Sequence, residues 1–214
     1  ATYGSTMPNT AWTLYAKDQA ENTVLSGATG ISGNVNAGSY NLSESFILGW
    51  ESNGWNCGDF GSSNNGLISL SLNLGDSAAC TITNSAIQPR IKVIKHVVDQ
   101  YGGGKTASDF SMTVTGTNVT LTPGNTGTAS SQTFSGSETG TYVYMDVGSY
   151  EVTETAIPGY TQTRSPDCSG TIDVGDIDRV CTITNTAQPP KLTVYKKVIN
   201  DDGGTKRISD FKLY

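Results

Sequence analysis

The stretch CTITNSA, residues 80–86, returns almost unchanged as CTITNTA, residues 181–187. Cys, Ile and Asn alternate with Thr in both copies, which is the period of two expected of a β-strand with one buried face. Asn is depleted in strands, yet Asn84 and Asn185 share the face of the apolar residues. Packing alone therefore does not explain the stretch, and its return after about 100 residues indicates a repeat.

The similarity extends well beyond this strand. GSYNLSESFILGW (38–50) matches GSYEVTETAIPGY (148–160), and the segment 89–110 matches the segment 190–211. The chain is thus a window on a tandem array with a period near 100 residues. We expect three parts: a repeat lacking its first strand at 1–88, a complete repeat at 89–188, and the first strands of a following repeat at 189–214.

Two explanations fit the position of these parts. Either the chain is a piece of a longer repeat protein, or residues 189–214 act as a donor strand that completes the 1–88 part of a neighbouring copy. GSTMPNTAW (4–12) aligns with GGTKRISDF (203–211) without a gap, so both ends carry the same element. Strand exchange would not require that duplication, and we favour the first explanation.

The composition favours an all-β protein with many turns. Only 15% of the 214 residues are charged, 25 are glycine, and no long stretch has helical periodicity. The net charge of −6 argues against a nucleic-acid partner, and no apolar run approaches the roughly 20 residues of a membrane-spanning helix. The complete repeat is expected to be a small sandwich of two sheets. Its short strands are predicted at 91–98, 109–115, 118–122, 132–134, 141–145, 149–155 and 179–185.

The four cysteines are predicted to form two disulfides. Cys57 pairs with Cys80 and Cys168 with Cys181, because each pair lies inside one repeat and the other two connectivities would cross repeats. Two disulfides imply an oxidising, extracellular setting. A zinc site is disfavoured because the cysteines are widely spaced and His96 is the only histidine, and we expect neither a metal nor a cofactor.

Three polar side chains are predicted to enter the core of the complete repeat. Lys95 falls on the more apolar face of IKVIKHV (91–97), and Glu154 shares the face of Tyr150 and Val152. Asn185 shares the face of the cysteine and isoleucine in its own strand. Burying charged groups is costly unless they pair or become neutral, so the three side chains are expected to interact.

A lysine in the first strand, a glutamate within Y-x-V-x-E-x-x-x-P-G-Y and an asparagine ending the last strand resemble the CnaB-type (prealbumin-like, SpaA-like) repeats of bacterial surface adhesins and pilins. The resemblance implies tandem immunoglobulin-like, prealbumin-like β-sandwich repeats of about 100 residues. It also implies an autocatalytic isopeptide bond, with Lys95 as nucleophile, Asn185 as electrophile and Glu154 as catalyst.

The residue types suit that chemistry. An apolar site favours the neutral amine of Lys95 and a protonated Glu154, which can polarise the Asn185 amide and pass a proton to departing ammonia. The alternative is a buried Lys95–Glu154 ion pair with a hydrogen-bonded Asn185.

The 1–88 part carries the equivalent pair, Glu44 and Asn84, without a lysine in the same window. An upstream strand would supply that lysine in a longer array. If the ends exchange, Lys196 of a neighbouring copy would supply it and link the subunits covalently.

The sequence therefore predicts a structural protein of an extracellular stalk, surface fibre or pilus-like filament at the cell surface, whose partners are neighbouring copies or adjacent repeats. Beyond a single-turnover bond formation, no enzymatic activity is expected. The second hypothesis is an adhesin that binds a host or surface ligand through an aromatic patch. It rests on the first repeat, which contains Trp12, Trp50 and Trp55, whereas the complete repeat contains no tryptophan.

Overall fold

The strands of the chain form two successive units, and the predicted all-β class is confirmed. The structure is a computed structural model that describes residues 2–124 and 127–214. The first unit contains β1 (Leu14–Asp18), β2 (Thr23–Gly27), β3 (Gly38–Glu44), β4 (Trp50–Asn56), β5 (Ile68–Leu72) and β6 (Thr81–Ala86). The second unit contains β7 (Arg90–Val98), β8 (Ser111–Thr115), β9 (Ser131–Ser135), β10 (Thr141–Tyr144), β11 (Gly148–Glu154), β12 (Tyr160–Arg164), β13 (Ser169–Ile172) and β14 (Arg179–Ala187).

The helical elements of the described chain are single 3-10 turns: three lie between strands, one precedes β1 and one follows β14. They are η1 (Asn9–Ala11), η2 (Gly58–Phe60), η3 (Ala107–Asp109), η4 (Pro166–Cys168) and η5 (Ile208–Asp210). The turn η3 has a reciprocal cap, in which Thr106 and Asp109 satisfy each other's backbone N–H groups. This cap fixes the entry of the chain into β8, directly after Phe110.

The second unit is a sandwich of two four-stranded sheets with the orders β10-β7-β14-β12 and β13-β11-β8-β9. Strands β7 and β14 run parallel, so the first and last strands of the unit are hydrogen-bonded neighbours. Alternate residues of both sheets meet in a core whose apolar side chains are almost fully buried, including Ile91, Val93, Met112, Val114, Val143, Met145, Val152 and Ile183. Burying each such side chain contributes roughly 1.5–3 kcal/mol, which makes this core the main source of stability.

The expected strands differ from the observed ones at three places. The strand predicted at 118–122 is wrong, because Asn118 adopts a positive φ of 52° and only an isolated bridge between Thr120 and Tyr144 forms. Strands β12 and β13 were not expected. Both lie at sheet edges and expose most of their residues, so they lack the alternating apolar pattern that marks a strand in sequence.

The first unit repeats most of this architecture but not all of it. Its larger sheet, β2-β1-β3-β5, has the same order as β9-β8-β11-β13, and its smaller sheet, β4-β6, corresponds to β12-β14. Strands matching β7 and β10 are missing from the described part of this unit. Residues 31–37, at the position of β10, form no strand there, and β7, the only strand that pairs with β10 among the described residues, has no counterpart in the first unit.

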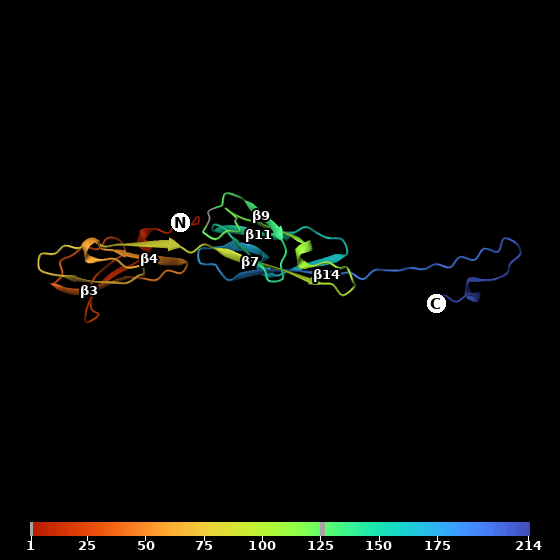
Figure 1. The fold of residues 1–214 in the computed structure, drawn as a ribbon, viewed down its shortest axis with the longest axis horizontal. Coiled ribbons are helices and arrows are strands. Elements are labelled where there is room, and N and C mark those ends of the chain that lie inside the picture. The colour runs from red at the N-terminus through yellow and green to blue at the C-terminus, as the bar shows by residue number, and fades with distance from the viewer. Residues whose placement is uncertain (1, 125–126) are drawn as a thin grey trace.

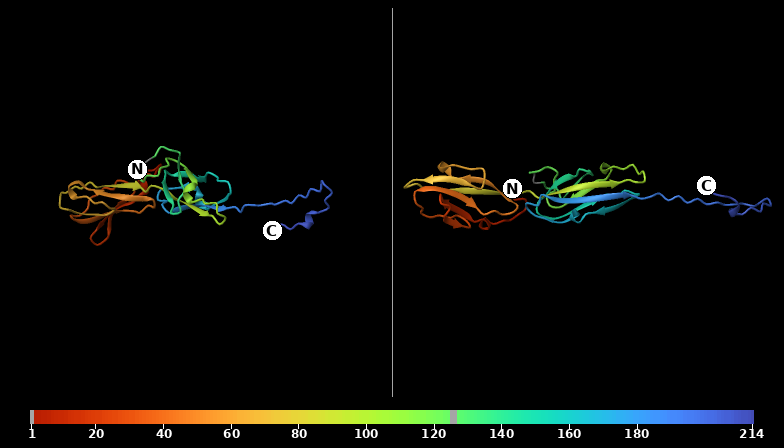
Figure 2. Two further views of the ribbon diagram at one scale, coloured as in Figure 1. Left: turned by 45° about the vertical axis from the view of Figure 1, so that its right-hand side comes forward. Right: turned by 90° about the horizontal axis from the view of Figure 1, so that it is seen from below.

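The two units are joined end to end, as Figure 1 and Figure 2 show. The backbone N–H of Val147 donates to Tyr3 at 2.9 Å, and Ile87 accepts from Gly175 at 3.1 Å. Val174 of the second unit packs against an apolar cluster of the first unit that contains Trp50. At Gly49 the backbones of the two units approach so closely that an added Cβ would lie 2.3 Å from the Val174 carbonyl oxygen.

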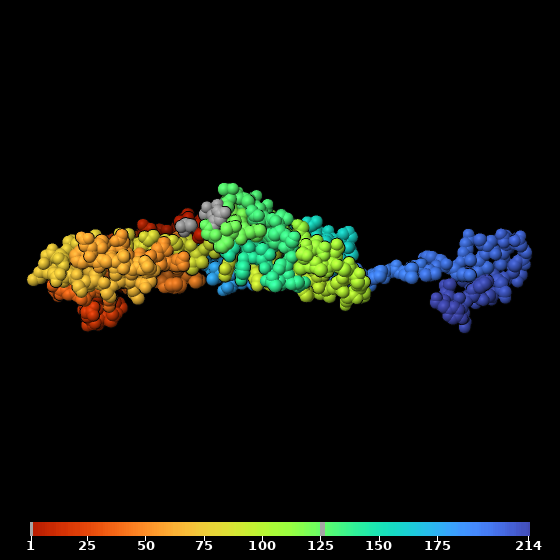
Figure 3. Space-filling view, viewed as in Figure 1, coloured from red at the N-terminus to blue at the C-terminus, as the bar shows by residue number. Residues whose placement is uncertain are grey.

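Beyond β14, residues 188–214 leave the second unit as an exposed segment whose first part is thin and extended (Figure 3). The chain then turns back before η5, as the ribbon of Figure 1 shows. The side chains of Leu192 and Tyr195 are 88% and 89% exposed. Within this C-terminal segment, the Lys196 Nζ lies 4.2 Å from the centre of the Phe211 ring. No strand of the described residues pairs with it.

Candidate functional site

The candidate site lies in the core of the second unit, where the first, last and β11 strands meet. In the parallel pair of β7 and β14, Ile183 is opposite Lys95 and Asn185 is opposite Val97. The period of two therefore places Lys95 and Asn185 on the same inward face, displaced by one inward position. Glu154 ends β11 in the other sheet and faces them across the core.

The three side chains are buried and in contact, as the alternation predicted. Lys95 Nζ lies 3.3 Å from Glu154 Oε2, and neither side chain is exposed to solvent. The other carboxylate oxygen of Glu154 accepts a hydrogen bond from Asn185 Nδ2 at 2.6 Å. A single carboxylate thus bridges the lysine amine and the asparagine amide.

Two backbone carbonyls complete the surroundings of the amine. Lys95 Nζ donates to the carbonyl of His96 at 3.0 Å and to that of Ile183 at 3.3 Å. Burial lowers the pKa of Lys95 below its usual value, and the facing carboxylate of Glu154 partly opposes this effect. The site therefore favours the neutral, nucleophilic amine more than water does.

The walls of the site hold the lysine stem in one place. The ring of Phe110 lies under the amine, with Nζ 4.3 Å from the ring centre. Gly136 lies against the stem, and a Cβ added there would be 2.7 Å from Lys95 Cβ and Cγ. Lys95 is thus fixed by packing as well as by its ion pair.

The asparagine carbonyl has no such support. Asn185 Oδ1 is buried and has no hydrogen-bond partner among the described residues, and the same is true of Asn84 Oδ1. An unpaired buried oxygen costs about 1–3 kcal/mol, so a recurring one calls for an explanation. Both amide oxygens are free to accept a hydrogen bond as negative charge develops on them.

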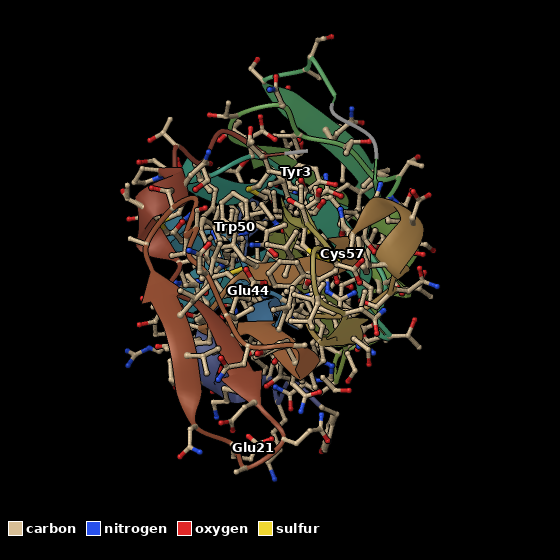
Figure 4. The ribbon with its side chains drawn as sticks, turned by 90° about the vertical axis from the view of Figure 1, so that its left-hand side faces the viewer. Tyr3, Glu21, Glu44, Trp50 and Cys57 are labelled. Atoms are coloured by element: carbon tan, nitrogen blue, oxygen red, sulfur yellow. A yellow bond between two sulfur atoms is a disulfide. The ribbon has the colours of Figure 1, made fainter. Side chains whose placement is uncertain are left out.

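The first unit contains the same carboxylate–amide pair without the lysine. Asn84 Nδ2 donates to Glu44 Oε2 at 2.8 Å. Burial raises the pKa of Glu44, and the hydrogen bond from Asn84 partly opposes this. Figure 4, which looks along the molecule, labels Glu44 and Trp50 inside the unit and Glu21 at its rim.

A hollow of about 250 Å³ adjoins this pair and is lined by Glu44, Asn84, Trp12 and Trp50 among others. The structure thus separates the predicted site residues into a complete site and a half-site. Lys95, Glu154 and Asn185 are together, Glu44 and Asn84 are together, and Lys196 lies in the C-terminal segment.

Both predicted disulfides are confirmed. Cys57 is bonded to Cys80, and Cys168 to Cys181. Cys80 directly precedes β6 and Cys181 lies within β14, so each disulfide ties the strand that carries the asparagine to the turn η2 or η4 of its own unit. Loops of 13 to 23 residues correspond to a stabilisation of about 3 kcal/mol on a chain-entropy model.

The aromatic patch expected for an adhesin does not form from the tryptophans. Trp12, Trp50 and Trp55 are 8%, 9% and 4% exposed. Trp12 and Trp50 pack edge to face with ring centres 5.2 Å apart, and Trp55 belongs to the core around its disulfide. The burial of large apolar rings accounts for their position without a ligand.

The aromatic side chain beside the lysine amine was not among the predicted site residues. Trp12, Phe110 and Phe211 occupy the same place in the three copies of the repeat, at the end of TAW or SDF. Phe110 contacts Lys95 of β7, Phe211 contacts Lys196 of the C-terminal segment, and Trp12 lines the hollow of the half-site. The recurrence of an aromatic residue there was the available signal.

Among the described residues, no helix is long and apolar enough to span a bilayer.

Comparison with solved structures finds weak, extensive similarities. The major pilin T3.2 of Streptococcus pyogenes has 13% identity and a TM-score of 0.36, over 88% of this chain and 95% of that chain. A C-terminal fragment of the pilus adhesin SpaC of Lactobacillus rhamnosus GG has 13% identity and a TM-score of 0.36, over 86% and 90% of the two chains. The minor pilin GBS52 of Streptococcus agalactiae has 13% identity and a TM-score of 0.31, over 86% and 85%.

Comparison with curated protein sequences finds no match. The family model described as a prealbumin-like fold domain matches residues 1–82 and again residues 88–187. These two matches cover nearly the whole of the two units and agree with their repeated sheet order. The chain therefore belongs to the family of prealbumin-like fold domains.

Proposed function

We propose that this chain is part of an extracellular stalk or pilus-like filament whose complete repeat is closed by an isopeptide bond between Lys95 and Asn185. The observation that carries this proposal is the buried contact of one carboxylate with both reacting groups. Glu154 lies 3.3 Å from the lysine amine and 2.6 Å from the amide nitrogen that would leave. Tandem prealbumin-like repeats, two disulfides and an end-to-end arrangement of the units support the structural role.

The bond would form in three steps. Lys95 passes a proton to Glu154, and the neutral amine attacks Cγ of Asn185. Glu154 then protonates the amide nitrogen, the bond from Cγ to Nδ2 breaks, and ammonia departs. Two protons leave Nζ in all: one reaches Nδ2, so that neutral ammonia departs, and the other remains on Glu154, which leaves the site without charge.

The reaction would convert a costly arrangement into a neutral one. Removing an ammonium and a carboxylate from water costs several kcal/mol per ion, even when they pair. A neutral amide in place of the charged pair removes much of that cost. A permanent ion pair is the competing explanation for the same geometry, and the product mass distinguishes the two.

The position of the bond suits a protein under tension. Because β7 and β14 are parallel, the chain enters the unit at Arg90 and leaves at Ala187, at opposite ends of the sandwich. Force applied to the chain would run along β7 to Lys95, cross the bond, and leave through the end of β14. The residues between 95 and 185 would carry almost no load.

The repeats, in this proposal, are domains that follow one another along the filament. Residues 89–188 form a complete domain, residues 1–88 a domain without its first strand, and residues 189–214 the start of the next domain. The partners are then adjacent repeats and neighbouring copies at the cell surface, where disulfides persist.

Single-molecule stretching tests the proposal. With the disulfides reduced, the Asn185→Ala variant should release the 89 residues between positions 95 and 185, a length of roughly 300 Å. The unsubstituted chain should not release this length at any force below covalent rupture. Glu138→Gln, which alters an exposed carboxylate near the same end of β7, is the matched control and should behave like the unsubstituted chain. Release of the full length by the unsubstituted chain would contradict the proposal.

A further inference from the structure

We propose that the first unit accepts residues 191–198 of a second copy as a parallel strand, and that Lys196 of that copy then bonds to Asn84. This inference rests on the proposed function, because it assigns to Asn84 and Glu44 the chemistry proposed for Asn185 and Glu154. It adds an intermolecular site and a partner, a second copy of this chain. It adopts the strand exchange that the sequence alone made the second explanation, and limits it to residues 191–198, because residues 4–12 already supply the element that 203–211 duplicates.

The acceptor is the open edge of β6. Within the described residues β6 pairs only with β4, whereas its counterpart β14 has β12 on one side and β7 on the other. Strand β7 is also the only strand that pairs with β10 among the described residues, and residues 31–37 at the equivalent place form no strand. The absence of one strand thus explains both differences between the units.

A hollow lies where the missing strand would place its apolar side chains. It has a volume of about 540 Å³ and is lined by Leu14, Leu42, Leu72 and Cys80, among others, and by the 30–37 segment. Leu14, Leu42 and Leu72 are only partly buried. Their counterparts Met112, Val152 and Ile172 are at most 2% exposed, in the core that Ile91 and Val93 complete.

The half-site has each part of the complete site except the amine. Glu44 and Asn84 form the same hydrogen bond as Glu154 and Asn185, and Trp12 lines their hollow in the place of Phe110. The unpaired oxygen of Asn84 repeats that of Asn185. Desolvation of Glu44 means that a lysine ammonium would find a carboxylate already partly removed from water.

The donor is the exposed C-terminal segment. Its sequence PKLTVYKKV, residues 190–198, matches PRIKVIKHV, residues 89–97, which contains most of β7. Leu192, Val194 and Lys196 take the places of Ile91, Val93 and Lys95. Leu192 and Val194 are 88% and 62% exposed, so their burial in the hollow would remove apolar surface from water and favour insertion.

The register follows from the second unit. Lys95 is opposite Ile183 and Val93 is opposite Cys181 in the parallel pair. Transferred to the first unit, Lys196 would lie opposite Ile82 and Val194 opposite Cys80. Asn84 would then lie one inward position beyond the residue opposite Lys196, as Asn185 does relative to Lys95.

Residues 191–198 lie too far from the first unit to insert into their own copy (Figure 1). In Figure 1 the C-terminal segment leaves the second unit at the end away from the first unit, and the whole second unit lies between donor and acceptor. In the free chain Lys196 contacts the exposed ring of Phe211. On insertion, Lys196 would lose this solvent-exposed contact with Phe211. Its amine would instead lie next to the ring of Trp12 and the carboxylate of Glu44.

The bond would form as in the second unit. The Lys196 amine attacks Cγ of Asn84, the bond from Cγ to Nδ2 breaks, and one ammonia leaves for each pair of chains joined. Glu44 carries the proton from the amine to the leaving nitrogen. Because each copy has one donor and one acceptor at opposite ends, the contact is head to tail and produces open filaments.

Complementary variants test the inference without uncontrolled polymerisation. The Lys196→Met chain keeps the acceptor, and the Asn84→Ala chain keeps the donor. Each alone should remain monomeric on a denaturing gel, whereas their mixture should yield a covalent dimer that contains a Lys196–Asn84 crosslinked peptide. Lys197→Met is the matched control for Lys196→Met, since alternation places Lys197 on the opposite face, and it should still polymerise.

Three results would overturn the inference: monomers only in the mixture, dimers that denaturant fully separates, or a crosslink from Asn84 to a lysine other than Lys196. The same mass spectra report the Lys95–Asn185 bond. If that bond is present while no dimer forms, only the strand exchange is wrong. If both are absent, the bond chemistry proposed for the complete repeat is wrong as well.

Discussion

Lys95 and Glu154 face each other across the two sheets of the second unit, with 3.3 Å between Nζ and Oε2 and no exposure of either side chain. A charged pair in such a place is expensive to maintain, whereas a covalent amide is not. The carboxylate also contacts the amide nitrogen of Asn185 at 2.6 Å, so it reaches both ends of a proton transfer. This double contact is the observation that supports the proposed reaction, and the product mass separates it from a structural ion pair.

Replacing Glu154 by glutamine should abolish the bond while changing the shape of the site very little. Glutamine cannot take a proton from Lys95 or return one to the leaving nitrogen. We expect the intact mass of Glu154→Gln to equal that of its sequence. The free energy of unfolding should fall by roughly 4–5 kcal/mol, the value for opening a loop of this length.

Glu138→Gln is the control for that substitution. Glu138 also carries a carboxylate, but it is exposed and contacts His96 at the surface. It should leave the mass and stability of the second unit nearly unchanged. A Glu154→Gln protein that still loses ammonia would show that the carboxylate is not needed.

Adding one methyl group at Gly136 should slow the reaction by displacing the lysine. The new Cβ would lie 2.7 Å from the stem of Lys95 and 2.5 Å from the Ala107 carbonyl oxygen, closer than atoms pack. We expect Gly136→Ala to cost about 1–3 kcal/mol and to reduce the crosslinked fraction after refolding. Gly38→Ala, where an added Cβ meets no neighbour, should affect neither quantity.

Reduction of the disulfides should destabilise the two units unequally. The first unit has only the Cys57–Cys80 disulfide as a staple, whereas the second would keep its isopeptide bond. Losing about 3 kcal/mol corresponds to a fall in Tm of roughly 12–24 °C for a unit of this size. All three tryptophans belong to the first unit, so their fluorescence reports its melting separately.

Circular dichroism after the tryptophan transition then follows the second unit. Its melting temperature should change much less on reduction. Equal shifts in both units would indicate that the second unit has no additional covalent bond.

The stability of the first unit should depend on the ionisation of Glu44. Burial raises the pKa of Glu44 above its usual value of 4.5, so the folded state binds the proton more tightly than the unfolded state. The resulting stabilisation is complete below about pH 4.5 and is lost as the pH rises through the folded pKa. The tryptophan-monitored Tm should fall across this window, and Glu44→Gln should flatten that fall.

Glu51→Gln provides the comparison for Glu44→Gln. Glu51 lies exposed on β4 in the same unit. Its substitution should leave the shape of the pH profile unchanged. A profile that flattens equally in both variants would remove Glu44 as its cause.

Much of the site followed from the alternation of residues in three strands. The alternation of residues predicted that Lys95, Glu154 and Asn185 enter the core, because each shares a strand face with apolar residues. The equivalent positions of the cysteines in the two repeats predicted both disulfides. Strands β12 and β13 could not be predicted, because an edge strand with little buried surface has no alternating pattern of apolar residues. The contact of Phe110 with Lys95 could not be predicted, because it depends on the way the η3 turn brings the two residues together.

The most direct measurement is the intact mass of the reduced protein, followed by peptide mapping around positions 95 and 185. A protein one ammonia lighter than its sequence, with a crosslinked peptide joining Lys95 to Asn185, is the predicted result. A mass equal to that of the fully reduced sequence, with the Lys95 and Asn185 peptides recovered separately, would contradict it and leave a buried ion pair in the core of the second unit.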